Sequence, residues 1–154
     1  SIDLTVQQGC ILSGDRMMLE QVMENLLSNA IKFSPFGKKI EVTVATVATV
    51  TTVAAVEAKE GNPGNPHTGA GSIIKITVRD EGPGLTDEDK KRLFGKFQRL
   101  SAKPTGGETS TGLGLSIIQG LVSLHGGEIR VESEPGKGCV FSIDLPVSRE
   151  QGTV

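Results

Sequence analysis

Apolar residues recur three or four positions apart between residues 19 and 33, which is the spacing of one face of a helix. The pattern predicts a helix over Arg16–Phe33, with Asp15 as its N-cap and a Pro- and Gly-containing turn at its end. A polar stripe follows the same spacing beside the apolar face, where it can border the core and still face a cavity. A surface helix with incidental amides is the alternative. The stripe consists of Asn25, Asn29 and Lys32.

Short runs in which apolar and polar residues alternate predict strands around this helix. The stretch after Val44 repeats about every three residues, and we interpret it as a continuing strand. Residues 60–72 are rich in Gly, Pro and Asn, which indicates a flexible loop between two strands of an extended hairpin. His67 in that loop has no visible partner ligand, so exposure to solvent is favoured over a metal site. The strands are expected at residues 2–6, 39–44 with its continuation, 73–78, 128–132 and 139–145, and the connection over residues 8–14 could include a brief further strand around residues 10–12.

Two further helices complete the pattern. A short one near residues 88–93 follows Thr86, whose hydroxyl is a suitable cap. A longer one runs from the glycines at 112 and 114 to about His125, and two glycines stop it. The order of elements predicts an α+β fold, a two-layer sandwich with a mixed, mostly antiparallel sheet of about five strands and about three helices on one face. The apolar positions of the longer helix are Leu115, Ile118, Leu121, Val122 and Leu124.

The composition excludes several classes of function. The chain has 154 residues, enough for one domain with a substantial core. Its net charge is −2, so no bulk field favours nucleic acid or an anionic membrane. It has five Phe and no Trp or Tyr, which argues against a stacking platform for single-stranded nucleic acid. Cys10 and Cys139 make no disulfide framework, so reduced thiols and an intracellular setting are expected.

The sequence also indicates how the chain is divided into a domain, an insertion and a tail. No apolar run approaches the length of a membrane span, and the start does not have the pattern of a signal peptide. We expect one domain over residues 1–148, with residues 45–72 as an extended hairpin insertion and residues 149–154 as a disordered tail. Because the chain begins within a strand-like run, we expect it to be part of a longer protein.

Two glycine pairs indicate nucleotide chemistry. Asp80 ends a predicted strand, and Gly82 and Gly84 after it allow a planar ligand to approach the backbone closely. A carboxylate there can accept a hydrogen bond from an amine such as N6 of adenine, while a tight turn with a capping Asp is the alternative. Gly112 and Gly114 stand at the start of a helix, where backbone N–H groups favour phosphate, and a hinge is the alternative. Neither pair is a dinucleotide fingerprint or a Walker loop.

Polar and basic residues near the glycines extend the candidate site. Thr111, immediately before the second pair, can add a hydroxyl. Phe94 and Phe97 are best explained by core packing, but Lys96 and Arg99 beside them are within reach of a terminal phosphate. Arg is the better suited of the two to a bidentate grip, although either residue taken singly is more often a surface cation.

The combination is far more specific than its parts. In this order the chain carries N-x-x-x-N-x-x-K, D-x-G-x-G, F-x-x-F and G-L-G-L. With NLLSNAIKFS, DEGPGL, LFGKFQRL and TGLGLSI it resembles the N, first glycine, F and second glycine boxes of the ATP-binding catalytic domain of sensor histidine kinases, which have a Bergerat-type fold shared with gyrase, Hsp90 and MutL. LHGGEIRVESEPGKGCVFSIDLP also resembles the closing segment of that family, so the resemblance covers nearly the whole chain.

The resemblance implies a role for each matching residue. Asn29 would coordinate Mg²⁺ with Asn25 as a near neighbour, and Lys32 would contact phosphate. Asp80 would bind adenine N6, and Arg99 would approach the γ-phosphate. Asn25, Lys32 and Arg99 are therefore the expected catalytic residues. The full set expected to bind ATP is Asn25, Asn29, Lys32, Phe33, Asp80, Gly82, Gly84, Leu85, Lys96, Arg99, Thr111, Gly112, Leu113, Gly114 and Leu115.

The remaining positions complete the implied site. Phe33 would lie near the adenine or ribose, and Leu113 or Leu115 would close the apolar wall. Residues 101–110 would form a lid over ATP. His125 matches a family position at a helix end, and we interpret it as structural and not as a phosphoacceptor.

The implied reaction is transfer of the γ-phosphoryl group from ATP·Mg²⁺ to a histidine on a separate helical dimerisation and phosphoacceptor domain. The expected partners are that domain and a response regulator receiver domain, with the isolated domain monomeric and the full-length kinase a homodimer. We expect a cytoplasmic domain of a protein that is either membrane-anchored or soluble. The alternatives are an ATPase, a serine kinase or a non-catalytic nucleotide sensor of the same fold. Gyrase-like ATPases carry Glu where Asn25 stands, and Asn cannot act as the base that activates water.

Overall fold

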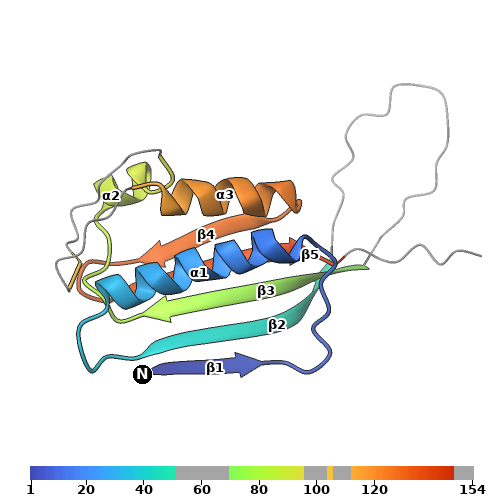
Figure 1. Cartoon of the computed structure of the whole chain (residues 1–154), viewed down its shortest axis with the longest axis horizontal. Coiled ribbons are helices and arrows are strands. Elements are labelled where there is room, and N and C mark those ends of the chain that lie inside the picture. Colours follow the sequence, from blue (N-terminus) through green and yellow to red (C-terminus); the bar gives the residue numbers. More distant parts are fainter. Residues whose placement is uncertain (51–69, 96–103, 106–111, 148–154) are drawn as a thin grey trace, which may run out of the picture.

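A computed structural model describes residues 1–50, 70–95, 104–105 and 112–147 of the chain. One sheet of five strands has the order β1-β2-β3-β5-β4 (Figure 1). The edge strand β1 is parallel to β2, and every other neighbouring pair is antiparallel, so the expected mixed, mostly antiparallel sheet is confirmed. The strands are β1 (Ile2–Val6), β2 (Ile40–Val50), β3 (Ala70–Asp80), β4 (Glu128–Ser133) and β5 (Cys139–Pro146).

Three helices accompany the sheet in the described part of the chain, namely α1 (Arg16–Phe33), α2 (Asp87–Arg92) and α3 (Gly114–Leu124). As predicted, Asp15 caps α1, and its side chain accepts a hydrogen bond of 3.0 Å from the Met18 N–H. Thr86 and Asp89 cap α2 reciprocally, which satisfies two backbone donors at once. The long helices α1 and α3 lie on the same face of the sheet, so the two-layer α+β architecture is confirmed (Figure 1).

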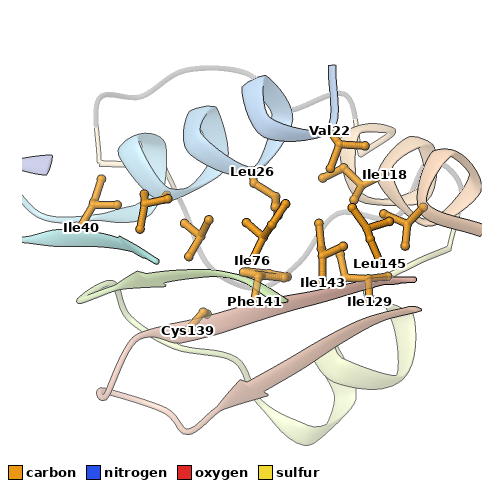
Figure 2. Close-up of a cluster of buried hydrophobic side chains, with 14 of the residues drawn as sticks. Val22, Leu26, Ile40, Ile76, Ile118, Ile129, Cys139, Phe141, Ile143 and Leu145 are labelled. Carbon is orange, nitrogen blue, oxygen red and sulfur yellow. The ribbon is translucent and has the colours of Figure 1, made fainter. Parts of the chain in front are cut away.

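The hydrophobic core fills the space between these two helices and the sheet. Figure 2 shows Leu26 of α1 and Ile118 of α3 directed toward sheet residues such as Ile143. Each of these three side chains is at most 1% exposed, and burial of such a side chain stabilises the fold by about 1.5–3 kcal/mol. Because α1 buries every fourth residue, its flank remains available for the polar stripe.

Three expectations about local structure were wrong. Residues 10–12 form no strand, because Cys10 reaches β2 through its side chain, at 3.4 Å from Thr46 Oγ1, and not through a backbone ladder. The strand β3 begins at Ala70, inside the expected loop, because its pairing with β2 continues as far as Val50. Leu124 is 74% exposed, since it lies about 200° around α3 from the buried Val122.

The expected hairpin is thus confirmed up to the pair Val50 and Ala70, while residues 51–69 lie outside the described part of the chain, as does the tail at 149–154. The domain limits of 1–148 stay a prediction. Within the described residues, no helix has the length and apolarity to cross a membrane.

Candidate functional site

The C-terminal end of α1, the loop after β3 and the first turn of α3 lie at the same end of the molecule (Figure 1). A Cβ placed on Gly82 would lie 2.8 Å from the carbonyl oxygen of Phe33. A Cβ placed on Gly114 would lie 3.3 Å from Asn25 Oδ1 and 3.8 Å from Asn29 Nδ2. The structure therefore brings the second glycine motif to the amide stripe of α1 and the first glycine motif to the C-terminal end of the same helix.

Asp80 is the buried acceptor of this site, with only 4% of its surface exposed. Its Oδ1 accepts hydrogen bonds from the N–H groups of Gly82, at 2.8 Å, and Cys139, at 3.2 Å. Burial raises the pKa of the Asp80 carboxyl, and the two backbone donors oppose this rise. Among the described residues no hydrogen bond reaches Oδ2, so this oxygen can accept the amine N–H of a ligand.

The polar stripe of α1 supplies amides and a cation. Asn25, Asn29 and Lys32 are all half-buried, as expected for side chains that flank the core. The Nδ2 of Asn25 donates to the Gln21 carbonyl at 2.9 Å, which leaves its Oδ1 on the side of Gly114. The carbonyl of Lys32 accepts a hydrogen bond from Thr105 at 2.8 Å, so this helix end also contacts a residue of the expected lid.

The donor set of the stripe fits Mg²⁺ when nucleotide oxygens complete the coordination. In the described part of the chain, no group of three or more His, Cys, Asp or Glu side chains could hold a metal. Amide oxygens are acceptable ligands for Mg²⁺, which commonly binds through few protein groups together with phosphates and water. Asn25 and Asn29 could supply those amide oxygens.

The first turn of α3 has the chemistry of an anion site. Its N-cap residue is Leu113, whose side chain has no acceptor for the first N–H groups of the helix, and no acidic residue lies in the first turn. Gly112 precedes it with a φ of +70°. Unsatisfied N–H groups together with the positive end of the helix dipole favour phosphate.

The other predicted residues divide into two groups. Leu85 is buried in the hydrophobic core, and Leu115 is partly buried against it. Phe33 is half-buried, and its carbonyl lies beside Gly82. Lys96, Arg99 and Thr111 lie outside the described residues, as does the expected lid except for Pro104 and Thr105.

His125 has the structural role that the sequence predicted. Its Nδ1 is 2.8 Å from the Leu121 carbonyl, and its Nε2 accepts a hydrogen bond of 3.1 Å from the Asp15 N–H. A proton on Nδ1 satisfies both contacts. The ring therefore ties the end of α3 to the beginning of α1, at the opposite end of α3 from Gly114.

Sequence reasoning predicted a turn over residues 134–138, between β4 and β5, but gave neither this turn nor Ser133 before it a role in the site. The Ser133 hydroxyl accepts a hydrogen bond of 2.9 Å from the N–H of Leu85, directly after the first glycine pair. The glycines of the turn were a visible signal of a turn. Nothing local indicated its contact with residues about fifty positions earlier.

Residues 14–149 match the family described as "Histidine kinase-, DNA gyrase B-, and HSP90-like ATPase". The match spans most of the chain, so the chain belongs to this family. Curated relatives and a solved structural neighbour are named as sensor kinases, which identifies the chain as an ATP-binding catalytic domain of the histidine kinase type.

Two curated relatives illustrate the similarity. The chain is 34% identical over 134 residues to the adaptive-response sensory kinase SasA of Prochlorococcus marinus, with 86% of this chain and 29% of that protein covered. It is 36% identical over 137 residues to the sensor histidine kinase RcsC of Escherichia coli, with 88% and 12% covered. The chain thus spans less than a third of either relative.

A solved structure supports the same fold. The mycobacterial sensor histidine kinase MprB superposes with a TM-score of 0.69 at 26% identity, over 94% of this chain and 82% of that one. The expected Bergerat-type architecture is therefore confirmed.

Proposed function

We propose that this domain binds ATP·Mg²⁺ and donates the γ-phosphoryl group to a histidine on a separate helical dimerisation domain of the same kinase. The observation that carries the proposal is the approach of the α1 amides to Gly114 at the same end of the molecule as the buried Asp80. Asp80 is a hydrogen-bond acceptor suited to the base of a nucleotide, and the start of α3 is suited to its phosphates. Both lie at one end of the fold.

The adenine end rests on Asp80. Its Oδ1 is held by two backbone donors, so Oδ2 has a defined direction and would accept the N6 hydrogen of adenine. Gly82 presents no side chain beside this carboxylate, so a flat base could approach the backbone. Phe33 would contact the base or the ribose.

The phosphate end rests on the beginning of α3 and on the polar stripe of α1. The first N–H groups of α3, which the Leu113 side chain does not cap, would bind phosphate oxygens, and Lys32 would add positive charge. Asn29 and Asn25 would hold Mg²⁺, which neutralises charge on the phosphates when it is bound. Lys96, Arg99 and Thr111 are proposed to complete the grip. They lie outside the described residues.

In the proposed reaction, a ring nitrogen of the acceptor histidine attacks the γ-phosphorus in line, and the bond to the β,γ-bridging oxygen breaks. ADP leaves, and the imidazole proton is released to solvent. Catalysis then depends on alignment and charge neutralisation, which are the proposed roles of Asn25, Lys32 and Arg99. Asn25 has no titratable group, so it cannot activate water as a general base, which favours transfer over hydrolysis.

The acceptor belongs to another domain in this proposal. Both ring nitrogens of His125 are engaged with backbone groups, so this histidine is not the acceptor. We propose a cytoplasmic setting with a response regulator receiver domain as the onward partner. In the same proposal the isolated domain is monomeric and the full-length kinase homodimeric.

The test is radiolabelled ATP with the isolated chain, first alone and then with the phosphoacceptor domain of its full-length kinase. We expect acid-labile, base-stable label on the added domain only, and its formation should require Mg²⁺. Label on serine of the partner would support a serine kinase. Rapid phosphate release by the isolated chain would support an ATPase, and binding without any transfer would support a nucleotide sensor.

A further inference from the structure

We propose that Ser133 and the turn at residues 134–138, called here the closing turn, position the loop at residues 80–85, called here the adenine loop. Ser133 then acts as a positioning residue for recognition of the adenine amine. The inference rests on the proposed function, because it concerns how Asp80 is aimed at a base.

Ser133 connects the two segments through one hydroxyl group. Its Oγ accepts a hydrogen bond from the Leu85 N–H at 2.9 Å and donates one to the Gly138 carbonyl at 2.7 Å. A hydroxyl has one donor and two acceptor positions, so it can serve both bonds at once. Because Leu85 is buried, its N–H would be costly to leave without this partner.

Two further hydrogen bonds join the same segments. The Gly136 N–H donates to the Pro83 carbonyl at 2.7 Å, and the Cys139 N–H donates to Asp80 Oδ1 at 3.2 Å. The closing turn and its flanking residues therefore hold the adenine loop at its beginning, its middle and its end.

The two backbones also interlock without room for side chains. A Cβ on Gly84 would overlap the Glu134 carbonyl, and a Cβ on Gly138 would overlap the Asp80 carbonyl. Both glycines have a positive φ, of +71° and +78°, which other residues rarely adopt. The shape of the adenine loop is therefore set by a segment about fifty residues later in the chain.

This arrangement has a specific consequence for recognition. Of the two donors that orient Asp80, Gly82 belongs to the adenine loop and Cys139 directly follows the closing turn. Loss of the Ser133 hydroxyl frees Leu85 and Gly138 from their common partner. The orientation of the Asp80 carboxylate, and with it the direction of Oδ2, should then become less defined. The positions of α1 and of the first turn of α3 should not change.

The experiment compares two nucleotides on the intact chain by calorimetry with Mg²⁺ present, ATP and purine riboside 5′-triphosphate, which is ATP without the 6-amino group. The wild-type chain should prefer ATP by about 10–100-fold, as expected for a hydrogen bond to a charged acceptor. In Ser133→Ala, ATP affinity should fall by about 5–10-fold, while affinity for the analogue changes less than about twofold.

Two variants separate positioning from general damage. Ser133→Thr keeps the hydroxyl and should restore most of the preference for ATP. Ser142→Ala removes a hydroxyl from the adjacent strand β5, and it should change neither affinity. An equal loss for both nucleotides in Ser133→Ala, or no loss for either, would overturn the positioning role. A wild-type chain that binds both nucleotides equally would refute adenine recognition by Asp80, and the inference with it.

A measurement on the wild-type chain covers the case in which Ser133→Ala does not fold. Coupling between the two segments is reciprocal, so ATP should slow amide hydrogen exchange at Gly136 in the closing turn as well as at Leu85. Protection of Gly82 with no change at Gly136 would show that the turn does not support the adenine loop.

Discussion

Asp80 and Leu113 stand at the two ends of the proposed nucleotide site, and their surroundings differ. Asp80 is 4% exposed and accepts two backbone hydrogen bonds. Leu113 begins α3 without any side-chain cap, so the first N–H groups of that helix lack a partner from the cap residue. The Asp80 end is therefore held by hydrogen bonds within the protein, whereas the helix start at Leu113 has no side-chain cap of its own.

The difference follows from the chemistry that each end would meet. A neutral base offers few hydrogen bonds, so a fixed acceptor is needed to distinguish one amine from a carbonyl. A triphosphate carries charge that attracts many donors from a distance, so free N–H groups and a cation suffice. The comparison predicts that substitutions at the adenine end act by changing the shape of the loop and the direction of its acceptor. Substitutions at the phosphate end should act through charge and through Mg²⁺.

The largest effect is expected from Gly84→Ala. The new Cβ would overlap the Glu134 carbonyl at a φ of +71°, so the free energy of unfolding should fall by about 2–5 kcal/mol and ATP binding should be lost with the loop geometry. Urea denaturation and calorimetry measure both. The matched control is Gly136→Ala, where φ is +81° and nothing lies within 4 Å, so the loss should be only the cost of the left-handed backbone, about 1–2 kcal/mol. Equal losses in the two variants would contradict the interlock.

Asp80→Asn is expected to have the next largest effect on binding. The amide places a donor where Oδ2 accepts, so ATP affinity should fall by about 10–100-fold. Calorimetry with ATP·Mg²⁺ measures this. The control is Asp87→Asn on α2, whose carboxylate is 90% exposed and paired with Lys90, and it should bind ATP as the wild type does.

The same Asp80 variant tests the pH dependence of stability. Because burial raises the pKa of Asp80, the stability linked to this group is present when the carboxyl is protonated and is lost as the pH rises through the raised pKa. Asp80→Asn should therefore be more stable than the wild type at neutral pH, and this advantage should shrink in acid. Urea denaturation of both proteins from about pH 4 to about pH 8 measures the difference. An advantage that grows in acid would refute the assignment.

Asn29→Ala tests the phosphate end with a smaller expected effect. Loss of one proposed Mg²⁺ ligand should lower ATP affinity about tenfold when Mg²⁺ is present and less than about twofold in its absence. Titrations with Mg²⁺ and with chelator measure the two values. Gln119→Ala, an exposed amide on α3, is the control. A loss that is the same with and without Mg²⁺ would show that Asn29 acts on folding or on the base.

The smallest effect is expected at the far end of α3. His125→Ala removes the contact between the end of α3 and the beginning of α1, so stability should fall by about 0.5–1.5 kcal/mol. ATP affinity should stay the same, because α3 separates this residue from Gly114. Denaturation and calorimetry measure both, and a parallel loss of affinity would show that the site extends along the whole helix.

Much of the fold followed from local patterns. The helix α1, its cap Asp15 and the cap of α2 at Thr86 could be predicted because these interactions span at most four residues. The errors at residues 10–12, at Ala70 and at Leu124 concern strand pairing and packing. These depend on which partner segment is present, and a short window of sequence does not contain it.

The sequence by itself determined which residue types are available to a nucleotide, namely the amide stripe, Asp80 and the two glycine pairs, and in what order they occur. Only the tertiary structure decided that the Leu85 N–H meets Ser133, 48 positions later, and that the Cys139 N–H meets Asp80, 59 positions earlier. The physical reason is that such contacts follow from the register of β3, β4 and β5, and this register is a property of the assembled sheet.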